Sequence, residues 1–167
     1  KLSISITQEF PEHQFAWKVL AVVLKLTGRL SESLVPSQKS VLLEPKDSEA
    51  HNNLGIILQE LGRLKEAEES FRKAIKIRPD YSEAHYNLGI TLKGLGRLKE
   101  AEDCYRQAIT LKPDYAEAHS NLGATLQELG RLKEAEDCYG QAITLKPGYA
   151  EAHYNLGITL KGLGRLK

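Results

Sequence analysis

Methionine is absent from this sequence of 167 residues, and the formal net charge is only +1. Nucleic acids and anionic membranes select for basic patches, so the small net charge argues against either as the main partner. No segment approaches the ~18 consecutive apolar residues of a membrane span, and the first residues lack the basic-then-apolar pattern of a signal peptide. The missing methionine predicts that the chain is processed or cut from something longer.

Cysteine is scarce as well, since Cys104 and Cys138 are the only two. This number suggests no disulfide framework and fits a reducing compartment, so we expect a cytoplasmic protein. With 41% hydrophobic and 27% charged residues, the composition is otherwise that of an ordinary soluble chain. The sequence shows no nucleophile–base arrangement, glycine-rich phosphate loop or metal-ligand spacing. We therefore expect neither enzymatic activity nor a cofactor.

What the sequence does contain is a repeat of 34 residues. Prolines recur at this interval, at Pro11, Pro45, Pro79, Pro113 and Pro147. Glycines keep the same step, at Gly28, Gly62, Gly96, Gly130 and Gly164. Residues 81–114 and 115–148 are identical at 27 of 34 positions. Such a period indicates a stack of supersecondary units.

Each unit is predicted to contain two helices. Apolar residues of the first helix fall on one face, as in Ala50, Leu54, Ile57, Leu58 and Leu61. Gly62 follows, where a left-handed residue would end the helix, and Pro79 ends the second helix of the unit. The second helix carries its own stripe, at Leu64, Ala67, Phe71, Ala74 and Ile75. Neither helix can bury its stripe alone, so the units are expected to stack into a solenoid.

A helix–turn–helix unit with this layout resembles the tetratricopeptide repeat (TPR). The family pattern is matched in one unit by His51, Leu54, Gly55, Leu58, Ala67, Phe71, Ala74 and Pro79, and in the next by His85, Leu88, Gly89, Leu92, Ala101, Tyr105, Ala108 and Pro113. The resemblance implies an all-α, right-handed α-solenoid (superhelix). It also implies a protein–protein interaction scaffold that holds an extended peptide or protein segment in its concave groove, as the substrate-presenting arm of a larger protein.

Residues 1–167 are interpreted as one array. Its parts are a remnant of a preceding unit (1–13), a degenerate unit (14–47), three full units (48–81, 82–115 and 116–149) and a truncated unit (150–167). Residues 1–11 are predicted to be the end of a second helix or else an extended segment. Pro36 lies inside the second helix of the degenerate unit, which should therefore start late or kink. Because the chain starts and ends within a unit, the alternative function is end-to-end assembly, with weak head-to-tail self-association.

In the TPR family the first helices line the concave binding face, so the resemblance selects five rows of residues, of which all but the glutamate row supply candidate peptide-binding residues. One row is mixed, with Asn52, Tyr86, Ser120 and Tyr154, and one is mostly apolar, with Val22, Ile56, Ile90, Ala124 and Ile158. A third alternates Gln59, Lys93, Gln127 and Lys161, and a row of glutamates runs through Glu49, Glu83, Glu117 and Glu151. Exposed isoleucine and tyrosine in register favour an apolar or aromatic ligand segment, although single exposed apolar residues are normal.

The remaining row contains asparagine: Asn53, Asn87, Asn121 and Asn155. Asparagine is a mediocre residue inside a helix, and its amide can both donate to and accept from a peptide group. This row resembles the asparagine ladder of the repeats of O-GlcNAc transferase, which implies a grip on an extended peptide backbone. Alternatively, each asparagine bonds a neighbouring helix and stabilises the stacking. The sequence leaves both interpretations open.

Two other types of site are disfavoured. His51, His85, His119 and His153 come from successive first helices about 10 Å apart, too far to share one metal ion, so they are predicted to be packing residues and no metal site is expected. A clamp for an acidic peptide tail could include Lys18. However, Val22 stands where that clamp needs an asparagine, and the glutamate row would repel an acidic tail.

Overall fold

The computed structural model of the protein describes Glu9 and residues 11–165. Within this part, every regular element is an α-helix. The helix or extended segment expected at the amino-terminal end, and the contact expected between the two chain ends, depend on residues 1–8, 10 and 166–167. Those residues lie outside the described part of the chain.

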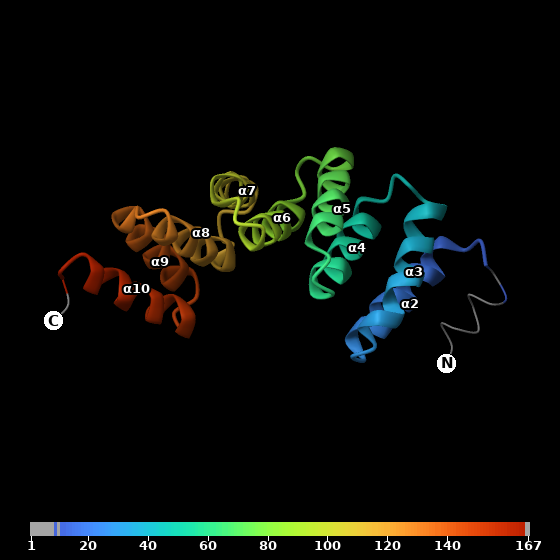
Figure 1. The fold of residues 1–167 in the computed structure, drawn as a ribbon, viewed down its shortest axis with the longest axis horizontal. Helices are drawn as coiled ribbons and strands as arrows, with labels where there is room; N and C mark the ends of the chain where they lie inside the picture. Colours follow the sequence, from blue (N-terminus) through green and yellow to red (C-terminus); the bar gives the residue numbers. More distant parts are fainter. Residues whose placement is uncertain (1–8, 10, 166–167) are drawn as a thin grey trace. The chain divides into compact units, whose positions relative to one another are not determined.

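The chain divides into two compact units, residues 1–80 and residues 81–167, and Figure 1 shows their helices in chain order. Unit one contains α2 (Gln14–Leu26), α3 (Leu30–Leu43), α4 (Ser48–Glu60) and α5 (Leu64–Ile77). Unit two contains α6 (Ser82–Gly94), α7 (Leu98–Leu111), α8 (Ala116–Glu128), α9 (Leu132–Leu145) and α10 (Ala150–Gly162). None of these helices is both long enough and apolar enough to span a membrane.

Within each unit, first and second helices of the repeats pack against each other. In unit one α2 packs on α3 and α4 on α5, while α4 also contacts α3. In unit two α6 packs on α7 and α8 on α9, while α8 also contacts α7 and α10 contacts α9. The apolar stripes supply these contacts, since Leu54, Ile57 and Leu58 of α4 are all buried. The predicted all-α fold of stacked helix–turn–helix repeats, an α-solenoid, is confirmed.

Each first helix ends at a glycine in the left-handed conformation, as the sequence predicts. Gly62 has φ +75°, and its amide donates to the carbonyl of Gln59 at 2.9 Å. The amide of Arg63 donates to the carbonyl of Leu58 at 2.8 Å. These two bonds form a Schellman motif, which satisfies the last carbonyls of the helix where only glycine adopts the required φ without strain. The second helix then begins at Leu64, so the turn determines where it starts.

The linker between repeats is held by a hydrogen bond from an aromatic side chain of the next first helix. The Nε2 atom of His51 lies 3.0 Å from the carbonyl oxygen of Pro45, and His119 and His153 contact Pro113 and Pro147 in the same way. At the equivalent position of the degenerate repeat, Trp17 Nε1 donates to the carbonyl of Pro11 at 2.7 Å. A proline carbonyl at the end of a helix has no intrahelical donor, so this bond satisfies it.

Close packing within a repeat depends on a glycine that faces an aromatic ring. The contact occurs in three repeats and pairs Gly55 with Phe71, Gly89 with Tyr105 and Gly123 with Tyr139. A Cβ atom at Gly89 would lie 2.7 Å from Cε1 of Tyr105, which is shorter than a van der Waals contact. The three rings are completely buried. Glycine is therefore required here for close approach of the second helix, while its backbone is helical.

The degenerate first repeat changes both members of this contact. Ala21 stands at the glycine position and Ser37 at the aromatic position, and both are 2% exposed. A larger residue on the first helix thus accompanies a much smaller one on the second helix. Such an exchange lets the two helices pack without overlap, because tolerated core changes conserve total volume.

The second helix of this repeat does not start late, so the first of the two predicted outcomes is wrong, while a kink at Pro36 stays a prediction. α3 begins at Leu30, in the same place relative to Gly28 as α5 begins relative to Gly62. The reason is that the Schellman turn before the helix sets its start, and Pro36 lies well inside the helix rather than at its start. Pro36 is buried, next to the small buried side chains of Ser33 and Ser37.

The glycine–aromatic contact generates a prediction with a built-in control. Gly89→Ala should lower the free energy of unfolding by about 1–3 kcal/mol, because the added methyl group meets the buried Tyr105 ring. Gly157 occupies the equivalent place in α10, where a Cβ atom would have no neighbour within 4 Å. Gly157→Ala should therefore be neutral or stabilise the helix by up to about 1 kcal/mol. Urea unfolding of both variants measures the difference, and equal effects would contradict the steric argument.

Candidate functional site

In unit two, α6, α8 and α10 bring the candidate rows together. α6 contacts α8, and α8 contacts α10, so positions 34 residues apart recur on adjacent helices. We call the surface that these rows form the first-helix face. Its members in unit two are Tyr86, Asn87, Ile90, Lys93, Ser120, Asn121, Ala124, Gln127, Tyr154, Asn155, Ile158 and Lys161. The corresponding residues of α4 in unit one are Asn52, Asn53, Ile56 and Gln59.

The asparagine row is half-buried on each helix, at Asn53, Asn87, Asn121 and Asn155. The Nδ2 atom of Asn121 donates to the hydroxyl of Tyr86 in the preceding repeat at 2.9 Å. One of its two N–H donors is used in this way, and the amide oxygen and the other N–H are the groups left to bind a ligand. Asn121 thus acts between neighbouring helices, which is the stacking role that the sequence left open for this row.

Tyr86 is itself held by aromatic neighbours. Its ring centroid lies 4.8 Å from that of Tyr115 and 6.0 Å from that of Tyr105. Burial raises the pKa of Tyr86 to about 12, and the charge of Glu117 acts in the same direction. Tyr115, which directly precedes α8, was not among the sequence candidates. Its recurrence as Tyr81, Tyr115 and Tyr149 at the end of each repeat was the available signal.

The mixed row does not have a uniform exposure. Tyr154 is 69% exposed, whereas Asn52 is 5% exposed and Ser120 is 2% exposed. Tyr149 of the next linker lies close to the buried Ser120, and burial raises the pKa of this phenol while the Ser120 hydroxyl lowers it. Tyr86 and Tyr154 are therefore the members of this row with side-chain surface for a ligand.

The apolar row is partly accessible on all the helices. Ile56, Ile90 and Ala124 are half-buried, and Ile158 is 42% exposed. Together with Tyr154, Ile158 gives α10 two accessible apolar side chains four residues apart, which share one side of the helix. This arrangement provides apolar contact area beside the asparagine row.

The alternating row joins neighbouring first helices. Lys93 of α6 forms an ion pair with Glu128 of α8 at 3.0 Å, and Lys25 of α2 forms the equivalent pair with Glu60 of α4 at 2.9 Å. On the next pair of helices the contact is neutral, since the hydroxyl of Thr159 donates to Gln127 Oε1 at 3.0 Å. Gln59 is half-buried and Lys161 is exposed.

Lys18, the one candidate for a clamp on an acidic peptide tail, is neutralised within unit one. Its Nζ atom lies 2.9 Å from Asp47 and 2.7 Å from Glu49. Asp47 also caps α4 by accepting from the amide of Ala50 at 3.0 Å. Partial burial opposes ionisation of Asp47, yet the hydrogen bonds from Lys18 and Ala50 outweigh it and lower the pKa of its carboxyl group. Two adjacent carboxylates leave this lysine poorly suited to an acidic ligand.

The histidines and cysteines differ in burial, since His51 is buried, His153 is exposed and both cysteines are half-buried. His51, His119 and His153 contact proline carbonyls, as described above. Among the residues that the structure describes, no group of three or more His, Cys, Asp and Glu side chains is placed to hold a metal ion. Neither cysteine forms a disulfide there, and burial raises the pKa of Cys138 to about 11. A thiol with a raised pKa is a poor nucleophile at neutral pH.

Comparisons with known proteins identify one family and one fold. Family models of the tetratricopeptide repeat match residues 46–114 and 116–149. A comparison with curated proteins gives no match.

Three solved structures illustrate the similarity. MamA is 24% identical, with a TM-score of 0.84 over 93% of this chain and 85% of that one. YrrB, described as a TPR protein with an unusual peptide-binding site, is 25% identical, with a TM-score of 0.81 over 99% of this chain and 85% of that one. The first TPR of Spaghetti (RPAP3), solved with an HSP90 peptide, is 24% identical, with a TM-score of 0.69 over 70% of this chain and 93% of that one.

The bond between Asn121 and Tyr86 can be measured by a double-mutant cycle. Asn121→Ala and Tyr86→Phe each remove one partner, and the double variant removes both. The coupling free energy should be about 0.5–1.5 kcal/mol, the usual net contribution of one hydrogen bond. Chemical unfolding of the four proteins provides the value. Strictly additive losses would contradict the bond.

The raised pKa of Tyr86 predicts a dependence of stability on alkaline pH. A phenol whose pKa is higher in the folded state favours folding below its unfolded value of 10.0, and this contribution is lost as the pH rises toward about 12. The melting temperature of the wild type should therefore fall more steeply over this interval than that of Tyr86→Phe. Parallel curves would show that Tyr86 ionises equally in both states.

Proposed function

This chain belongs to the tetratricopeptide repeat family and is a protein-interaction scaffold, and we propose that it grips an extended peptide along the first-helix face. Its partner is a protein or a peptide. The observation that carries the proposal is the alignment of Asn87, Asn121 and Asn155 on three successive first helices of unit two, beside the accessible apolar surface of Ile90 and Ile158. Amides supply backbone recognition, and the apolar row supplies contact area.

The spacing of the helices suggests the conformation of the ligand. Packed helices lie about 8–10 Å apart, so consecutive asparagines of the row are separated by about that distance. A peptide in the polyproline II conformation rises about 3.1 Å per residue and presents the same side every third residue, about 9.3 Å along the chain. One peptide group in three would therefore meet an asparagine. Such recognition is directed at the backbone and is tolerant of ligand sequence.

Two further observations support a peptide as the ligand. YrrB, which is similar over nearly the whole chain, is described as having a peptide-binding site. The bond from Asn121 to Tyr86 also fixes the amide before a ligand arrives, and a pre-positioned group loses less conformational entropy on binding.

A peptide selected from a phage-displayed library against the wild-type protein provides the probe for this proposal. Asn87→Ala/Asn121→Ala should weaken its binding about tenfold or more, since two hydrogen bonds of about 1 kcal/mol each are lost. Fluorescence polarisation measures Kd, and melting temperature checks the fold. N-methylation of every third backbone amide of the peptide should have a similar effect.

Two control variants separate recognition from stability. Tyr86→Phe removes the same inter-repeat bond as Asn121→Ala but keeps the amide, so it should weaken peptide binding less than the asparagine variant does. Lys133→Ala changes an exposed residue of α9, away from the face, and should leave both properties unchanged. If the asparagine variant melts earlier but binds normally, the asparagines only stabilise the stack and the proposal is wrong. Concentration-dependent polymers without peptide binding would instead favour end-to-end assembly.

A further inference from the structure

In unit one, α3 differs from every other second helix on its outward side. Val35 is 66% exposed and Leu42 is 71% exposed. The equivalent residues of the later repeats are polar or charged: Glu69, Asp103 and Asp137 for Val35, and Lys76, Thr110 and Thr144 for Leu42. Exposed apolar residues that line up on one side of an element mark interaction surfaces more often than singly scattered ones do.

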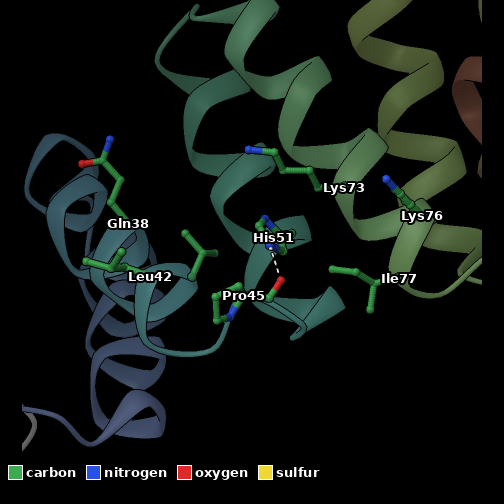
Figure 2. A pocket seen from close by; sticks show the side chains of 8 residues that line it. Gln38, Leu42, Pro45, His51, Lys73, Lys76 and Ile77 are labelled. Atoms are coloured by element: carbon green, nitrogen blue, oxygen red, sulfur yellow. Dashed lines mark hydrogen bonds between the residues drawn. The ribbon is translucent and has the colours of Figure 1, made fainter.

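A groove runs beside this surface, between α3 and α5, with a volume of about 660 Å³. Figure 2 shows Leu42 on one wall and Ile77 on the other, with Pro45 and His51 between them. On that floor, the Nε2 atom of His51 is hydrogen-bonded to the carbonyl oxygen of Pro45, at 3.0 Å. Ile77 is 38% exposed. The interior of the groove is thus predominantly apolar.

The α5 wall also carries two lysines, Lys73 and Lys76, both exposed. Residues three apart in a helix lie on the same side, so the two ammonium groups line one rim of the groove. The groove lining contains no acidic side chain, and none of the ion pairs among the described residues uses either lysine. This rim is therefore positively charged and available for a carboxylate ligand.

The corresponding groove of unit two, between α7 and α9, has a different chemistry on the same backbone. Its volume is about 380 Å³, and its lining includes Arg106, Thr110 and Asp137. Arg106 reaches across to Glu134 of α9 at 3.5 Å. The positions of the two lysines hold Gln141 and Thr144 there. An apolar, lysine-rimmed groove is therefore not a general consequence of stacking these repeats.

We infer that the groove between α3 and α5 binds an amphipathic, acidic helix of a partner protein. Aliphatic side chains of that helix pack on Val41, Leu42 and Ile77, and its carboxylates pair with Lys73 and Lys76. Val35 and Leu42 lie seven residues apart, about two turns of α3, so Val35 extends the exposed apolar side of this helix beyond the groove wall. The walls of this site come from second helices, and none of its lining residues belongs to the first-helix face.

The test uses a fluorescein-labelled synthetic helix with leucines on one face and glutamates along its borders. The variant Leu42→Thr/Lys73→Gln/Lys76→Thr gives the groove the residues that unit two has at the same positions. All three are exposed, so folding should be preserved. The variant should bind the synthetic helix at least about tenfold more weakly, a difference of 1.4 kcal/mol. A version of the helix with lysines in place of glutamates should not bind the wild type.

A matched control, Lys65→Gln/Lys99→Thr, removes the same charge from exposed sites outside the groove and should bind within about twofold of the wild type. If the control and the groove variant bind the acidic helix equally weakly, its binding depends only on non-specific charge attraction, and the inference is overturned. The inference is also overturned if the groove variant binds as well as the wild type.

Other occupants of the groove would give different results. If the acidic helix does not bind but the wild type binds phosphatidylserine vesicles and the groove variant does not, the surface belongs to a lipid. If the acidic helix does not bind but the wild type sediments as a dimer and the groove variant does not, the surface belongs to a second copy of the chain. The peptide that binds the first-helix face should be unaffected by either variant.

Discussion

The contact between a glycine of the first helix and an aromatic ring of the second sets the distance between the two helices of a repeat. Because Gly55, Gly89 and Gly123 have no side chain, Phe71, Tyr105 and Tyr139 can lie directly against the helix backbone and be fully buried. Dispersion forces weaken steeply with separation, so this approach also determines how well the leucines and alanines around it pack. The part of each first helix that the second helix does not cover stays accessible. The candidate peptide site borders this contact, since Tyr86 of the first-helix face lies 6.0 Å from the Tyr105 ring that packs on Gly89.

The linkers between repeats are held by hydrogen bonds as well as by apolar contacts. A proline carbonyl accepts from His51, His119 and His153, and Trp17 supplies the donor in the repeat whose other consensus positions have changed most. Preservation of this donor, while the glycine–aromatic pair is replaced by Ala21 and Ser37, indicates that the linker tolerates less change than the interior. The accepting prolines are exposed, so these bonds fix the geometry of the linker, whereas a core can be refilled in several ways.

Much of the fold could be predicted because its determinants are local and repeated. The 34-residue period, the apolar stripes and the left-handed glycine at Gly62 all act within one repeat. The partners of the candidate site residues could not be predicted in the same way. Whether Asn121 meets a tyrosine depends on the residue that the preceding repeat places at position 86, and Ser120 lies close to Tyr149 of the next linker. The start of α3 was misjudged because the rule against proline inside a helix was weighed without the turn at Gly28, which fixes the start.

The ion pairs along the first helices give the array a two-repeat alternation. With the degenerate unit counted as the first repeat, Lys25 of the first repeat pairs with Glu60 of the second, and Lys93 of the third pairs with Glu128 of the fourth. Between the fourth and fifth repeats the contact is neutral, because Gln127 accepts a hydrogen bond from Thr159. Loss of the fourth repeat by unequal recombination would place Lys93 beside the fifth repeat, which has Gly162 at the position of Glu128. Loss of two consecutive repeats would again place a lysine of this row beside a glutamate. Along this row, lengthening or shortening of the array in steps of two therefore keeps the lysine–glutamate pairs, while steps of one leave a lysine without its carboxylate.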